Sequence, residues 1–369
     1  MVRRLPLLNG LAALASVLYH STSWGFVAMF WWTHRYLAVS VPNFDQLGSL
    51  SYYGLRVIEQ LIAFAIAAFL FISGFFVACA TGRSRATMEW KLVGIRIRNL
   101  MIPYLFWSVV TFIDDSLQGT THSAIEYLKK LALGQAADPY YYIILLSQLY
   151  LLSPLIVPIA RKKWKLLLSV AALVQLVARG SHYMALLGVE TRALELVLTM
   201  TPNWLFPRRI FWFAFGIVAG FHLQPLKLWL ARVRWGLLAA VVILVPLGVL
   251  EWEAVYRLSG RDWLASSITP LDNLYAGAFI LCFLAFDKVS IPFSRELGEV
   301  GTRSLGVYLV HSQVLALVSR IAYHVAPWIL ACQALFQPML IVLGLGIPLL
   351  LMAVVDRSPA RRVYRHLFG

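Results

Sequence analysis

Apolar runs of about 20 residues recur along the whole chain, and they constrain its fold more than any other feature. A helix of that length crosses the hydrocarbon core of a bilayer. Of the 369 residues, 60% are hydrophobic and only 13% are charged, and the mean hydropathy is +0.74. These values predict an integral membrane protein and exclude an ordinary soluble domain.

Ten such runs, each bounded by charges or by Gly and Pro, predict an all-α bundle of about ten transmembrane helices. They lie at 5–26, 55–80, 98–116, 139–160, 164–180, 208–223, 235–252, 271–287, 304–323 and 328–355. No segment is rich enough in Pro, Ser or charge to form a linker or a soluble domain. We therefore expect residues 1–369 to form one membrane domain.

Loop charges orient the predicted bundle, because short loops rich in Lys and Arg stay in the cytoplasm. If the N-terminus is inside, the N-terminal segment, the alternate loops and the C-terminal tail hold 21 of the 32 basic residues. Both termini then face the cytoplasm, and the net charge of +15 reflects attraction to anionic lipids of the plasma membrane. The basic residues are scattered and form no aromatic-interleaved face, so we expect no nucleic-acid partner.

The three cysteines, Cys79, Cys282 and Cys332, show no CxxC spacing and lie in or beside apolar segments. They indicate neither a disulfide framework nor a metal motif. We expect no metal ion and no bound cofactor, and the sequence does not determine an oligomeric state.

A polar stripe runs down the first predicted helix. At about 100° per residue, Asn9, Ser16, His20 and Ser23 fall within roughly 60° of one another. An ionisable group at membrane depth usually faces the bundle interior or a water-filled cavity, although a packed, hydrogen-bonded histidine is the alternative. His20 comes fifteen residues after the start of the helix, about 22 Å across a core of about 30 Å, which places it toward the outer side.

A second polar stripe lies on the ninth predicted helix, where Ser304, Tyr308 and His311 follow i, i+4, i+7 spacing. His311 could orient a partner, line a channel, or only form hydrogen bonds between helices. Glu59, at the outer end of the second helix, is the best candidate to orient His20, because both should lie toward the outer side.

Five segments resemble, in order, motifs of the acyltransferase 3 family of membrane-bound, acyl-CoA-dependent acyltransferases. They are "NGLAALASVLYH" (9–20), "FLFISGFF" (69–76), "RIRNLMIPYLFWS" (96–108), "YYYIILLSQLYLLSPLI" (140–156) and "SLGVYLVHS" (304–312). Each motif is weak alone, and five in the right order are specific.

The resemblance implies transfer of an acyl group, often acetyl or succinyl, from cytoplasmic acyl-CoA to a hydroxyl of a glycan or glycolipid outside, in a bacterial inner membrane. It implies that His20 acts as the base, because neutral imidazole accepts protons near physiological pH. A transient acyl-histidine is the rival mechanism. Asn9 stands where the family usually has an arginine. Asparagine can form a hydrogen bond with the anionic acyl-CoA but cannot neutralise its charge.

The cytoplasmic motifs suggest a donor site. Gly74 beside Ser73 permits close approach of a neighbouring helix or a ligand. Arg96 and Arg98 precede the third helix, where they suit the phosphates of coenzyme A or serve only to anchor the topology. We assign Asn9, Ser73, Arg96, Arg98, Tyr308 and His311 as candidate substrate-binding residues, and His20 and Glu59 as candidate catalytic residues.

Two other classes of protein remain open. An exporter of a polysaccharide or a lipid-linked sugar could use the same polar stripes, although the sequence shows no inverted repeat and no broken helix pair. A structural membrane protein would need no aligned polar stripes.

Overall fold

The computed structural model describes residues 2–82, 85–261, 263–264 and 269–369. Within these ranges 82% of the chain is helical and no strand occurs, which confirms the all-α prediction. Arg83, counted above among the cytoplasmic basic residues, lies outside the described residues.

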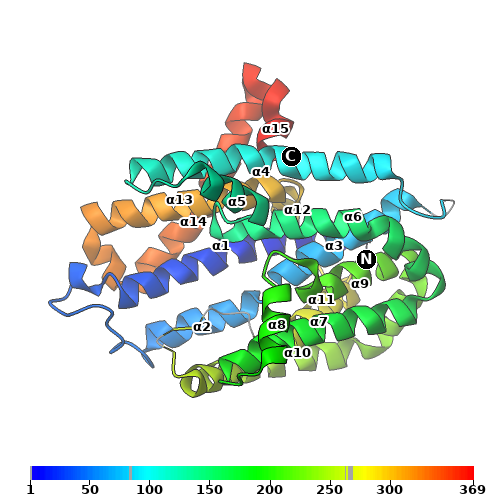
Figure 1. The fold of residues 1–369 in the computed structure, drawn as a ribbon, viewed down its shortest axis with the longest axis horizontal. Helices are drawn as coiled ribbons and strands as arrows, with labels where there is room; N and C mark the ends of the chain where they lie inside the picture. The colour runs from blue at the N-terminus through cyan, green and yellow to red at the C-terminus, as the bar shows by residue number, and fades with distance from the viewer. Residues whose placement is uncertain (1, 83–84, 262, 265–268) are drawn as a thin grey trace.

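All ten predicted segments form helices (Figure 1). They are α1 (Leu5–Phe30), α2 (Leu50–Ile62) with α3 (Ala65–Thr81), α4 (Trp90–Leu117), α6 (Tyr141–Lys162), α7 (Trp164–Leu186), α9 (Ile210–Phe221), α10 (Leu223–Ser259), α11 (Pro270–Ala285), α13 (Ser304–Val325) and α14 (Gln333–Arg357). Seven segments of the described chain are long and apolar enough to cross a membrane. The chain is therefore a multi-pass membrane protein.

The second predicted helix forms one apolar span, Leu50–Thr81, but it contains a turn that was not expected. It breaks at Ala63 and Phe64 into α2 and α3, which are joined by a short turn. Irregular backbone at membrane depth is tolerated where it is buried in protein or lines a cavity, because lipid offers no hydrogen bonds. Ala63 and its neighbours Ile62 and Ala65 do line a cavity, described below.

The sixth predicted helix is too short to cross the membrane. As α9 it has 12 residues, about 18 Å of helix. It ends at His222, and α10, with 37 residues, starts beside it. Arg208 and Arg209, which come just before α9, are half-buried and line a cavity described below.

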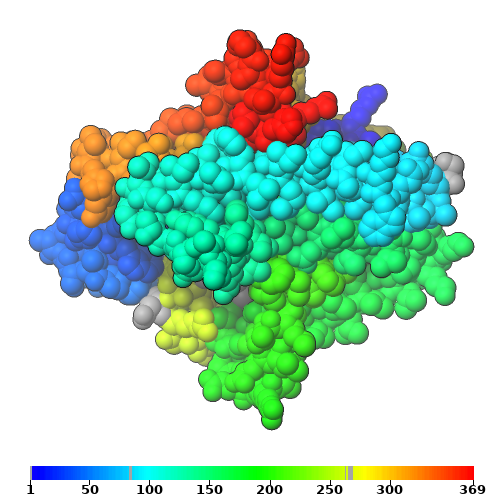
Figure 2. Space-filling view, turned by 45° about the horizontal axis from the view of Figure 1, so that its top comes forward, coloured from blue at the N-terminus to red at the C-terminus, as the bar shows by residue number. Residues whose placement is uncertain are grey.

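Four short helices were not predicted. They are α5 (Ala124–Leu133), α8 (Arg192–Met200), α12 (Ser294–Thr302) and α15 (Tyr364–Phe368). Serine and glutamate in "SAIE" form a capping box at the start of α5, and this signal was readable from the sequence. In Figure 2, α8 projects from the lower edge of the molecule, in green, below the teal surface of α5.

Helix α1 lies in the centre of the bundle, where it packs against α2, α3, α12, α13 and α14 (Figure 1). It is not among the seven most apolar spans, since its stripe of polar residues lowers its mean hydropathy. Helix α13 runs beside α1 in the same direction, because Asn9 contacts Ser304 and the ring of His20 contacts His311. Helix α14 returns, so both ends of the chain leave the bundle on the same side.

Two glycines allow α3 and α9 to pack closely. A Cβ on Gly74 would clash with the carbonyl oxygen of Phe213, and a Cβ on Gly216 would clash with the carbonyl oxygen of Phe71. These contacts between backbones explain the Ser-Gly-Phe motif physically, because small residues let membrane helices approach. Gly74 therefore has a packing role.

Candidate active site

The two polar stripes predicted from the sequence face each other in the structure. At one end, Asn9 Nδ2 donates to Ser304 Oγ at 2.8 Å and to the carbonyl oxygen of Gly301 at 2.6 Å. At the other, the ring centroids of His20 and His311 lie 5.2 Å apart. Asn9 is thus used in joining α1 to α13, and Ser304 is its partner.

His311 is completely buried and is held by its own helix. Its Nδ1 lies 3.0 Å from the carbonyl oxygen of Val307. Because a carbonyl oxygen only accepts, Nδ1 carries the proton and donates a hydrogen bond to it. Its Nε2 then holds the lone pair, and among the described residues it has no hydrogen-bond partner. Beside His20, the buried His311 offers one open acceptor nitrogen.

His20 lines a cavity of about 490 Å³ inside the bundle. Ser16, Tyr308 and Tyr141 line it too, as do residues 62, 63 and 65–67 and part of the segment that joins α5 to α6. A volume of this size suits a small ligand or one residue of a larger one. His311 has no exposed surface and is not among the residues that line this cavity.

Tyr308 fixes the wall of the cavity. Its hydroxyl donates to the carbonyl oxygen of Pro139, and Tyr140 returns a hydrogen bond to the carbonyl oxygen of Leu309 at 2.7 Å. Because its hydroxyl is used in this way, Tyr308 joins α13 to the start of α6 while its ring contacts the cavity.

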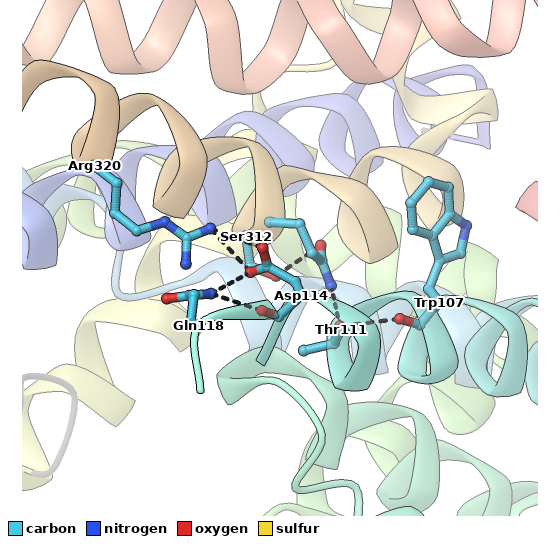
Figure 3. Close-up of polar contacts among 7 residues, drawn as sticks. Trp107, Thr111, Asp114, Gln118, Ser312 and Arg320 are labelled. Atoms are coloured by element: carbon cyan, nitrogen blue, oxygen red, sulfur yellow. Dashed lines mark hydrogen bonds and ion pairs between the residues drawn. The ribbon is translucent and has the colours of Figure 1, made fainter. Parts of the chain in front are cut away.

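A polar network farther along α13 holds this helix against α4 (Figure 3). The side-chain amide of Gln313 lies 2.9 Å from Thr111 Oγ1 and 2.5 Å from the hydroxyl of Tyr140. Nearer the outer end, Arg320 Nη2 pairs with Asp114 Oδ2 at 2.9 Å. The helix that carries His311 is thereby anchored on the side away from α1.

Glu59 contacts Arg56 and Thr22. It forms a buried ion pair with Arg56, and Thr22 Oγ1 donates to its Oε1 at 3.5 Å. The Arg56 guanidinium lies over the Trp252 ring, 3.3 Å from the centroid. Glu59 is not among the residues that line the cavity, and its action on His20 stays a prediction.

Ser73, Arg96 and Arg98, which the sequence predicts at the acyl-CoA site, lie away from this cavity. Arg96 donates to the carbonyl oxygen of Phe76 at 3.1 Å and contacts the Tyr150 hydroxyl at 3.4 Å, while Arg98 is exposed. Ser73 lies half-buried on α3. The three residues gather toward the predicted cytoplasmic end, and their binding roles stay predictions.

A second cavity, of about 630 Å³, opens near the N-terminus. Arg3, Arg4 and Arg295 line it together with Asp287. Arg4 is engaged with carbonyl oxygens, including that of Phe286 at 3.0 Å. Among the described residues, no group of three His, Cys, Asp or Glu side chains could hold a metal ion.

Several residues of the His20 cavity were not predicted. They are Tyr141, Arg179, Arg208, Arg209 and Asp272. Arg179 lies inside an apolar helix, and an intramembrane arginine is itself a functional signal. That signal was present in the sequence, whereas the convergence of α7, α9 and α11 on one cavity depends on tertiary packing.

The protein is a helical membrane bundle with an internal cavity that His20 lines. A family model described as an acyltransferase domain matches residues 3–355, nearly the whole chain. The chain belongs to the acyltransferase 3 family and is an acyltransferase. No curated protein and no solved structure matches it.

Proposed function

We propose that the chain transfers an acyl group, acetyl or succinyl, from cytoplasmic acyl-CoA to a hydroxyl of a glycan or glycolipid on the outer side of a bacterial inner membrane. The observation that carries this proposal is the position of His20 on the wall of the buried cavity, with His311 against it. The family supplies the reaction type.

In the proposed reaction, a ring nitrogen of His20 takes the proton of the acceptor hydroxyl as its oxygen attacks the thioester carbonyl carbon. The carbon–sulfur bond breaks, and the proton passes from the imidazolium to the departing thiolate of coenzyme A. A neutral imidazole suits both steps, because it can accept and return a proton near neutral pH.

In this proposal the two ends of α1 serve different substrates. Its outer half carries His20, and the acceptor reaches it through the cavity. The exposed Arg98 and the arginines of the N-terminal cavity are available to the phosphates of coenzyme A at the other end. The slender pantetheine arm then reaches inward between the helices.

Replacing His20 tests this function. In purified full-length protein in lipid nanodiscs, His20→Ala should lower acyl-CoA consumption with an acceptor by about 10²–10⁴-fold, the usual effect of losing a general base. His122→Ala is the matched control, because it removes an imidazole that does not line the cavity. Wild-type rates in His20→Ala would remove His20 from the chemistry. An exporter would move its sugar without any loss of thioester.

A further inference from the structure

The cavity beside His20 carries an excess of positive charge. Arg179, Arg208 and Arg209 line it, and the carboxylates on its wall are Asp138 and Asp272. A cation inside a membrane bundle is costly unless an anion is close to it. Three guanidinium groups facing two carboxylates therefore leave the cavity one negative charge short.

The carboxylates of the wall do not neutralise Arg208 and Arg209. In the part of the chain that the structure describes, neither side chain takes part in a hydrogen bond or an ion pair, and the Nε of Arg209 is buried without a partner. The Arg209 guanidinium carbon lies 5.3 Å from the centroid of the Tyr141 ring. Asp272 acts electrostatically on Arg179 and also accepts from the backbone N–H of Thr269 at 3.1 Å.

The backbone that carries these two arginines is held in place by two glutamine side chains. Gln148 donates to the carbonyl oxygen of Trp204 at 2.9 Å and accepts from the N–H of Phe206 at 3.2 Å. Gln175 accepts from the N–H of Phe211 at 3.2 Å. Side chains held on a fixed backbone lose less entropy on binding, as expected of a recognition site.

Arg179 lies at about the same depth as His20. Arg179 comes fifteen residues after the first residue of α7, as His20 does on α1, so both lie about 22 Å from the ends of their helices at the predicted cytoplasmic face. The phosphates of coenzyme A would remain at that face. The missing anion therefore belongs to the part of a substrate that reaches His20.

We propose that Arg208 and Arg209 bind an oxyanion, a carboxylate or a phosphate, of the substrate in this cavity. This inference rests on the proposed acyl transfer and names its substrate class as acidic. The arginine fork binds both groups bidentately, which gives orientation as well as affinity. The anion has two possible sources, an acidic sugar of the acceptor or the distal carboxylate of a succinyl donor.

The acceptor source is tested by calorimetric binding of glucose, glucuronate and glucose 6-phosphate to full-length protein in nanodiscs. We expect the two acidic probes to bind about tenfold or more tightly than glucose, since hydrogen bonds to charged groups are strong. Arg208→Gln with Arg209→Gln should abolish this difference, and the double Lys variant should keep part of it, because it keeps the charge and loses the fork. Arg192→Gln, on the exposed surface of α8, is the matched control.

The donor source is tested by comparing consumption of succinyl-CoA and acetyl-CoA. A preference for succinyl-CoA that disappears in the double Gln variant supports an acyl carboxylate at these arginines. If that variant, still folded by its melting curve, keeps every preference of the wild type, or if the wild type has none, the inference is overturned.

Binding measured in His20→Ala separates the two proposals. Acidic probes that still bind while transfer is unaffected by loss of His20 overturn the catalytic assignment and leave the oxyanion site standing. If transfer is lost in His20→Ala and acidic probes bind no better than glucose, the catalytic assignment stands and the oxyanion site is overturned.

Discussion

His20 and His311 meet ring to ring across α1 and α13, with their centroids 5.2 Å apart. Only His20 lines the cavity, while His311 is fully buried and donates Nδ1–H to Val307. The open Nε2 of His311 can accept a hydrogen bond from a ring N–H of His20 and so select which nitrogen of His20 stays free for substrate. His311 is thus a positioning residue in the proposed mechanism.

His311→Phe keeps an aromatic ring at this position and removes the ring nitrogens. It should lower kcat by about 10–100-fold, the loss seen when the hydrogen-bond partner of a metal-binding histidine is removed. KM should change little, because His311 does not line the cavity. Steady-state kinetics and thermal melting separate this effect from loss of fold. His311→Gln, which retains an acceptor, should recover part of the activity, and equal losses in both variants would contradict the orienting role.

Arg98→Ala should weaken coenzyme A binding by about tenfold, as expected for the loss of a charged hydrogen bond to phosphate. Its melting temperature should stay near that of the wild type, because Arg98 is exposed. Arg98→Lys should restore only part of the affinity, since lysine lacks the planar fork. Calorimetry with coenzyme A measures this, and unchanged affinity would assign Arg98 to membrane topology alone.

Arg96→Ala should lower the stability of the protein and leave its affinity for coenzyme A unchanged. Arg96 joins α4 to α3 and α6 through Phe76 and Tyr150, so its loss should lower the stability by about 1–3 kcal/mol. Reversible unfolding in mixed micelles provides the measurement. A variant with wild-type stability and reduced coenzyme A affinity would make Arg96 a ligand-binding residue instead.

Gly74→Ala should destabilise the protein by about 1–3 kcal/mol or more, because the new methyl group meets the backbone of Phe213, which cannot rotate away. Gly94→Ala is the matched control. Gly94 also lies in a helix and faces open space, so alanine there should be neutral or stabilising through its higher helix propensity. Similar melting temperatures for the two variants would show that α3 and α9 can move apart at no cost.

Helix α5 should loosen in acid. The backbone N–H of Ser123 donates to Glu126 at 2.8 Å, and this hydrogen bond holds the pKa of the Glu126 carboxyl below its usual value. The capping contribution is therefore complete above pH 4.5 and is lost as the pH falls through the lowered folded value. The protection factors of the α5 amides, which correct for the intrinsic pH dependence of exchange, should fall over that interval in the wild type, whereas those of Glu126→Gln should stay constant.

The sequence predicted most of the helices because lipid demands long apolar runs, which are local features. It also predicted the two polar stripes, since Asn9 with His20 and Ser304 with His311 follow helical spacing, but only the structure shows that the stripes face each other. The break at Ala63 and Phe64 was missed because both residues are apolar and compatible with a helix. Arg208 and Arg209 were missed as cavity residues, because the cavity forms only where helices distant in the sequence pack together.

The central position of α1 has a consequence for biosynthesis. The partners of Asn9 lie 292 and 295 residues later in the chain, so α1 is inserted long before α12 and α13 exist. At about 5–20 residues per second, its polar stripe spends roughly 15–60 s in the bilayer without native contacts. The native contacts of this stripe with α12 and α13 can therefore form only after almost the last helix has been made.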